Sequence, residues 1–250
     1  MNYTMIQIYF SIHKFQKTVV FFTLLILFSC NKTARLEKEI KAIPIKIEVE
    51  RFDQMFMQSN KESLASLKIQ YPFLFPKQIS DSIFLERIQD PIQKMIRKSV
   101  DSVFSNFQNT EAELTSLYKH LKYYNPSLKE PRVITVFSDV DYRNKVIVTD
   151  TIVLISIDNY LGANHEFYES FYKYIQKNLK KDQIVMDLAD AYAAHFINQS
   201  RQKTFLDELI YYGKKLYLKD LWVPSATDNT KIGYSNNEFL WAQDNEFYIW

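Results

Sequence analysis

Apolar positions along this chain recur mostly at helical spacing. Between residues 91 and 107 they fall at Ile92, Met95, Ile96 and Val103, which places them on one face of a helix. Similar apolar spacing, with capping residues or prolines at the segment ends, predicts further helices. Most of the chain is therefore expected to be helical. The predicted helices cover 61–70, 80–89, 91–107, 110–124, 165–178, 183–199, 203–217 and 236–250.

Polar residues before several of these segments predict where the helices begin. Asn60 is a good N-cap for the helix over 61–70, and Asp53 is a candidate N-cap for a short helix that ends at Met57. Asn109 and Thr110, with Glu113 behind them, form the pattern of a capping box.

The middle of the chain has the residue pattern of strands rather than of helices. Runs rich in valine and isoleucine at 132–137, 145–149 and 152–157 predict strands, and turn residues separate them. We expect a small antiparallel meander, joined by a strand over 45–50 in which apolar and polar residues alternate. Residues 71–76 should be extended, because each proline disfavours the helical region for the residue before it. Helices before and after a small sheet predict an α+β fold.

The apolar run near the N-terminus predicts a secretion signal. It covers 19–28, follows Lys14 and Lys17, and leads directly into Ser29 and Cys30. A spanning helix needs about 20 apolar residues, whereas the apolar region of a signal peptide has about 7–15. This layout is typical of a bacterial lipoprotein signal peptide. The alternatives are a short uncleaved anchor, or a buried strand or helix with a cysteine there by chance.

The signal peptide divides the chain. Residues 1–29 would be removed, and Cys30 would carry a diacylglyceryl thioether and an N-acyl chain. Several acyl chains hold a protein on a membrane stably, whereas one chain binds only marginally. The polar segment 30–42 would then be a tether, and 43–250 a single domain. We expect a cell-envelope protein that is held on its membrane by lipid and faces the periplasm.

Composition excludes several kinds of function. The chain has three glycines, so it carries neither a P-loop nor the glycine-rich dinucleotide fingerprint. Its net charge of +2 comes from Lys14 and Lys17, so the mature protein is neutral and lacks the basic excess expected of a nucleic-acid-binding protein. Cys30 is the only cysteine, which excludes an intrachain disulfide. The 17 tyrosines and 19 phenylalanines predict an aromatic core, or alternatively a surface for a sugar or peptide.

One segment resembles a metal-binding motif. His165 and Glu166 begin like the zincin helix HExxH, but Glu169 stands where the second histidine belongs. On a helix His165 and Glu169 would share a face, Glu166 would be a general base, and Asp187 or Asp190 could add an oxygen ligand. A catalytic zinc site normally has more nitrogen or sulfur ligands than this. We therefore favour solvated residues at the start of an aromatic helix, and we expect no metal or other cofactor.

The remaining polar candidates have ordinary structural interpretations. Asp187 and Asp190 share a helix face, where we expect them to face solvent or to pair with lysine or arginine rather than to act as an acid–base pair. His195 is expected to be half-buried and hydrogen-bonded, and His120, flanked by lysines, to be exposed. No serine stands in a nucleophile-elbow motif, so we expect no catalytic residue.

Several blocks of the sequence resemble one family. They are YPFLFP, KHLKYYNPSLKEPRVITVFSDVDYRNKVIV, SIDNYLG, ELIYYGKKLYLKDLWVP, KIGYS and LWAQDNEFYIW. In this order, behind the signal peptide, they are similar to the gliding-motility lipoprotein GldB family of Bacteroidota. The resemblance implies a fold distantly like that of zinc peptidases, without the metal motif. It also implies that relatives continue beyond the equivalent of Trp250, so the C-terminus is expected to be incomplete.

The resemblance also implies a function. We expect a non-catalytic lipoprotein of the gliding and secretion apparatus, whose partners are the membrane, through its lipid, and other envelope proteins of that apparatus. The alternative is a zinc-dependent peptidase-like hydrolase that uses His165, Glu166 and Glu169.

Overall fold

The computed structural model describes residues 31–249. Its contacts divide the chain into two units, 1–44 and 45–250, which are described separately. In the first unit, α2 (Asn31–Lys41) is a helix supported by an ion pair of 3.0 Å between Arg35 and Glu39. The predicted tether is therefore helical over most of its length. Its role as a spacer stays a prediction.

The second unit contains a four-stranded mixed sheet in the order β1-β2-β4-β3. Its strands are β1 (Val49–Glu50), β2 (Arg132–Val136), β3 (Val146–Val148) and β4 (Ile152–Ser156). β1 and β4 both pair in parallel with β2, and β3 pairs antiparallel with β4.

The prediction of an antiparallel sheet is therefore wrong, although the positions of its strands were largely right. β4 inserts between β2 and β3, so β2 lies beside a strand that runs in its own direction. Strand patterning reports which segments are extended, but not the order in which they pair.

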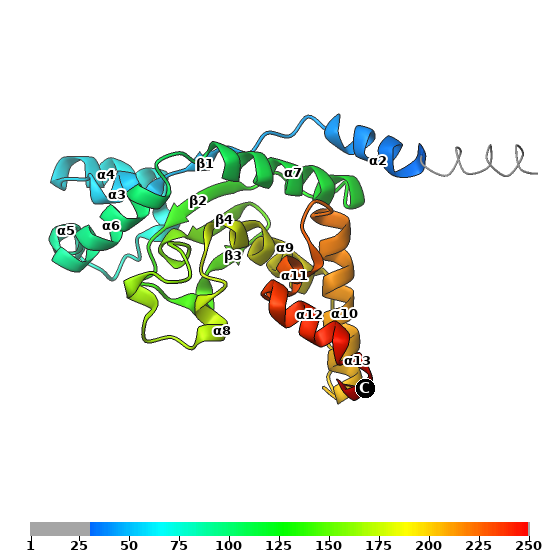
Figure 1. The fold of residues 1–250 in the computed structure, drawn as a ribbon. Helices are drawn as coiled ribbons and strands as arrows, with labels where there is room; N and C mark the ends of the chain where they lie inside the picture. Colours follow the sequence, from blue (N-terminus) through cyan, green and yellow to red (C-terminus); the bar gives the residue numbers. More distant parts are fainter. Residues whose placement is uncertain (1–30, 250) are drawn as a thin grey trace, which may run out of the picture. The chain divides into compact units, whose positions relative to one another are not determined.

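Helices lie along the chain between β1 and β2 and again after β4 (Figure 1). Those before β2 are α3 (Phe52–Met57), α4 (Lys61–Gln70), α5 (Asp81–Gln89), α6 (Pro91–Val103) and α7 (Gln108–Tyr124). Those after β4 are α8 (Lys173–Gln176), α9 (Ile184–Phe196), α10 (Phe205–Trp222), α11 (Asp228–Ile232), α12 (Asn236–Asp244) and α13 (Glu246–Ile249). α9 contacts β3, α7 and α10, so it joins the sheet to the helices at the C-terminal end. The α+β class and the helical majority are confirmed.

Several local predictions differ from the structure. The predicted helix over 165–178 is a 3₁₀ turn, Glu166–Tyr168, followed by the single-turn helix α8. Pro72–Leu74 is also a 3₁₀ turn rather than extended chain. α7 begins at Gln108 without a side-chain cap, so the predicted capping box does not form. Asp53 lies inside α3, where it is buried and bonded to Arg51 and Thr135 rather than capping the helix.

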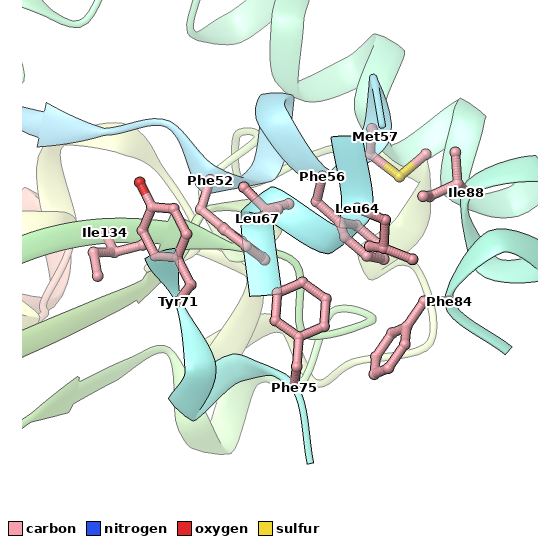
Figure 2. Close-up of a cluster of buried hydrophobic side chains, with 10 residues drawn as sticks. All are labelled: Phe52, Phe56, Met57, Leu64, Leu67, Tyr71, Phe75, Phe84, Ile88 and Ile134. Carbon is pink, nitrogen blue, oxygen red and sulfur yellow. The ribbon is translucent and has the colours of Figure 1, made fainter. Parts of the chain in front are cut away.

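One part of the core joins the first helices to the sheet (Figure 2). Its members come from α3, α4, α5 and β2 and from the segment between α4 and α5. They are Phe52, Phe56, Met57, Leu64, Leu67, Tyr71, Phe75, Phe84, Ile88 and Ile134. Four aromatic rings of this group contact one another at centroid distances between 5.0 and 6.3 Å. Burial of such large apolar side chains is a main source of folding free energy.

The C-terminal helices expose several apolar side chains. On α10 these include Phe205, Leu206 and Tyr217, and on α12 and α13 they include Trp241 and Phe247. No helix within residues 31–249 combines the length and the apolar character needed to cross a membrane.

The cap of α4 allows a direct test of helix capping. Asn60 Oδ1 accepts hydrogen bonds from the backbone N–H groups of Glu62 and Ser63 at 3.0 and 2.9 Å, so the predicted cap is confirmed. Asn60→Ala should lower the free energy of unfolding by about 1 kcal/mol, measured by urea denaturation. Ser80→Ala is the control, because Ser80 is the N-cap of α5 but makes no capping bond. Equal losses from both variants would contradict the capping argument.

Candidate functional site

The carboxyl ends of β2 and β4 bring polar residues together. The two strands are parallel neighbours, so the segments that follow them leave the same edge of the sheet. Ser138 and Asp139 follow β2, whereas Asp158 and Asn159 follow β4. Open sheets with parallel strands commonly bind ligands at this edge. The edge is therefore the first place to look for a functional site.

Asp158 organises the loop after β2. It is fully buried, and its carboxylate accepts hydrogen bonds from the backbone N–H groups of Ser138 and Val140, the latter at 2.7 Å. The Ser138 hydroxyl donates a further bond at 3.3 Å. Burial raises the pKa of Asp158 above its usual value, against the opposing effect of these donors. The carboxylate thus fixes the backbone of the neighbouring loop.

That loop has an uncommon backbone conformation. Asp139 and Val140 have φ angles of 59° and 61°, in the left-handed region. Aspartate adopts this region occasionally, but a β-branched valine rarely does. Such strain persists only where the surroundings enforce it, and it is concentrated at functional sites. The bonds to Asp158 supply the enforcement here.

The strained loop presents the Asp139 carboxylate to α5 and α6. Arg87 Nη2 and Gln93 Nε2 each donate a hydrogen bond of 2.6 Å to Asp139 Oδ1. Gln93 is 7% exposed, and its own Oε1 is buried without a hydrogen-bond donor from residues 31–249. Asn159 Oδ1, at the same edge of the sheet, is likewise buried without a donor among the described residues. Native proteins leave few buried polar atoms unpaired, so both atoms are notable.

A cavity of about 750 Å³ lies over Arg87, Gln93 and Asp139, and we call it the Asp139 groove. The residues that line it form a charged centre with apolar side chains around it, which come from α5, α6 and the segment around 167–171. The lining residues are Ile83, Glu86, Arg87, Asp90, Ile92, Gln93, Ile96, Asp139, Val140, Phe167 and Phe171. A second cavity of about 350 Å³ shares Arg87 and Asp139 with it and reaches the aromatic core. Mostly apolar cavities with a few polar groups are typical of ligand sites.

The residues of the predicted metal motif do not converge. His165 precedes the 3₁₀ turn, and its Nδ1 accepts a hydrogen bond of 3.3 Å from the Phe167 N–H. Glu166 and Glu169 are exposed. In a 3₁₀ helix residues three apart align, so His165 and Glu169 do not share the face that an α-helix would give them. Among residues 31–249 no group of three or more histidine, cysteine, aspartate or glutamate side chains could hold a metal ion.

Asp187 and Asp190 both form ion pairs, which is one of the two arrangements expected from the sequence. Asp187 Oδ2 lies 2.6 Å from Lys145 Nζ and accepts a bond of 2.9 Å from the Tyr160 hydroxyl. Asp190 pairs with Lys215 at 2.5 Å and with Lys219 at 2.8 Å. Burial raises the pKa of Asp187 despite Lys145. Burial also acts to raise the pKa of Asp190, but the two lysines lower it overall. These pairs join α9 to α10 and to the chain before β3.

Both predictions for the histidine environments are wrong. His120 is buried, with Nδ1 2.8 Å from the Ser116 carbonyl oxygen, because its face of α7 points into the protein. His195 lies in the last turn of α9 and is exposed. Flanking residues indicate charge along a helix but do not determine which face is covered.

Sequence reasoning missed the Asp139 groove. The only local signal was the run of Ser138, Asp139 and Asp141 directly after a strand. Recognising it required the parallel pairing of β2 with β4, which the antiparallel prediction excluded. Cys30, the predicted lipid attachment site, lies outside the described residues.

Comparison with known proteins supports one relationship. The family model "Gliding motility protein GldB" matches residues 33–250. No curated protein and no solved structure matches the chain. Neither the described residues nor these comparisons support the expected distant likeness to zinc peptidases. Because the matched region extends over nearly the whole chain behind Cys30, this protein belongs to the GldB family of gliding-motility lipoproteins.

Proposed function

We propose that this protein is a lipid-anchored, periplasm-facing component of the gliding and secretion apparatus that acts through protein contacts rather than catalysis. The family match over residues 33–250 is the observation that carries the proposal. That match begins three residues behind Cys30.

The chain's own features agree with this role. The run over 19–28, the preceding lysines and Cys30 supply the signal for lipid attachment. A multiply acylated cysteine would hold the protein on its membrane, while the α+β domain folds in water. Apolar side chains exposed around a charged centre, as in the Asp139 groove, suit contacts with another protein. The partner is argued further below.

Loss of the lipid attachment site should abolish function. In a strain from which the gene is deleted, the wild-type chain should restore gliding and secretion, whereas Cys30→Ala should restore neither. The reason is that the variant has no acyl chains to hold it at the membrane. Colony spreading, secreted protein and membrane fractionation with immunoblotting measure the three effects.

A matched variant separates anchoring from expression. Ser11→Ala changes the polar segment before the apolar run and should complement fully. Full complementation by Cys30→Ala would contradict the anchoring proposal. A deletion strain with normal gliding and secretion would contradict the role in motility.

A further inference from the structure

We propose that the Asp139 groove binds a segment of a partner protein in which a lysine or arginine side chain lies between apolar side chains. The inference deepens the proposed function and rests on it for the partner being an envelope protein. It stands on four features of the groove: its charge, its unpaired acceptors, its apolar walls and its fixed loop.

The groove carries more negative than positive charge. Glu86, Asp90 and Asp139 contribute three carboxylates, whereas Arg87 is the only cation among the described residues that line it. Asp90 Oδ1 already accepts the N–H groups of Ile92 and Gln93 at the start of α6. Glu86 is exposed and remains available to an occupant. A cationic side chain complements this field better than a neutral or anionic one.

The centre of the groove has acceptors left over. Arg87 and Gln93 both bond to Asp139 Oδ1, and no residue within 31–249 donates a hydrogen bond to Oδ2. Gln93 Oε1 also has no donor in this part of the chain. An ammonium group carries three donors and a guanidinium five, and neither carries an acceptor. A bound cation could therefore donate to Asp139 Oδ2.

The apolar walls of the groove favour a bound segment in which apolar side chains flank the cationic one. Ile92 is 61% exposed and Ile83 is 53% exposed, although both lie in the groove. Phe167 and Phe171 add aromatic rings, which attract cations over their faces as well as apolar groups. The exposed isoleucines extend the apolar surface beyond the charged centre. This extension suits a peptide segment with several side chains better than a small cation alone.

The loop after β2 is prepared for binding. The bonds from Ser138 and Val140 to the buried Asp158 hold Asp139 in place before any partner arrives. A site that is already ordered loses less conformational entropy when it binds. The left-handed backbone at Val140 is part of this fixed loop, which directs the Asp139 carboxylate toward Arg87 on α5 and Gln93 on α6.

A peptide library tests the inference and does not require the partner to be identified first. The full chain is purified in detergent micelles and labelled. It is used to select binding peptides from a library of heptapeptides that are acetylated at the N-terminus, amidated at the C-terminus and randomised at five positions. The selected peptides should contain lysine or arginine with apolar residues on both sides. In fluorescence anisotropy, replacement of that basic residue by norleucine should weaken binding about tenfold or more, because charge-assisted hydrogen bonds are lost.

Variants of the groove locate the binding. Asp139→Asn should weaken binding about tenfold, and it preserves the fold because asparagine tolerates a φ near 60°. Glu86→Gln changes an exposed side chain and should weaken binding several-fold through the loss of one charge. Asp150→Asn is the matched control, since Asp150 is an exposed carboxylate outside the groove. It should leave binding unchanged.

Selected peptides without a basic residue, an absence of selected peptides, or unchanged binding in both groove variants would each overturn the inference. These outcomes are independent of complementation by Cys30→Ala. A failed peptide experiment therefore leaves the anchoring proposal standing, and full complementation by Cys30→Ala leaves the peptide result standing.

Discussion

Phe75→Ala should lower the free energy of unfolding by about 3–4 kcal/mol. Phe75 is 5% exposed, and its ring centroid lies 5.0 Å from that of Phe84 on α5 and 5.8 Å from that of Phe52 on α3 (Figure 2). Truncation would remove apolar burial and leave a cavity between these elements. Urea denaturation followed by circular dichroism measures the change.

Phe73 provides a control from the same short segment. It is 42% exposed, and its ring contacts Tyr71 and the Arg132 guanidinium at the surface. Phe73→Ala should therefore cost less than about 1 kcal/mol. If the two variants lost equal stability, the aromatic core would not hold α3 and α5 together as described.

Asp158→Ala should destabilise the protein by about 3 kcal/mol or more. It would leave the part-buried N–H groups of Ser138 and Val140 without their carboxylate acceptor, and each such loss costs about 1–3 kcal/mol. The left-handed backbone at Asp139 and Val140 would also lose its support. Denaturant unfolding measures the global effect, and amide hydrogen exchange at Val140 measures the local one.

Asp158→Asn is the matched variant. Its amide keeps one oxygen acceptor but turns an NH₂ group toward the remaining backbone donor. Because burial already raises the pKa of Asp158, loss of the charge alone is a smaller penalty than loss of both acceptors. We expect a loss of about 1–2 kcal/mol, between wild type and Asp158→Ala. A neutral effect of Asp158→Ala would contradict the role of this carboxylate in holding the loop.

Local residues determined the helices where capping and periodicity agreed. The helix over 61–70 was predicted with its bounds, since Asn60 supplies an acceptor that the first turn requires. The prediction failed over 165–178, where Gln176 is buried and its Nε2 donates to the carbonyl oxygens of Tyr168 and Phe171. These side-chain bonds satisfy backbone groups that a helix would otherwise have paired.

The pairing of Asp187 and Asp190 with basic residues followed from the sequence only as an alternative to solvent exposure, because carboxylates are normally either solvated or paired. The identities of those partners did not, since Lys145 and Lys219 come from other elements. The same limit applies to the Asp139 groove. Its charged centre combines Arg87 and Gln93 with Asp139, more than 40 positions further along the chain.

The sequence by itself determined the family, the α+β class and most of the helices, and the signal peptide before Cys30 stays a prediction. The family rests on the resemblance of ordered sequence blocks, and the class and the helices depend on local spacing and capping, which the chain carries without folding. Only the tertiary structure decided the strand order, the strained loop and the groove. Each of these results from pairing between distant segments, above all the insertion of β4 beside β2, which brings Asp158 beneath Ser138 and Val140. Local patterns cannot encode that choice, because β2 could form backbone hydrogen bonds with either neighbour.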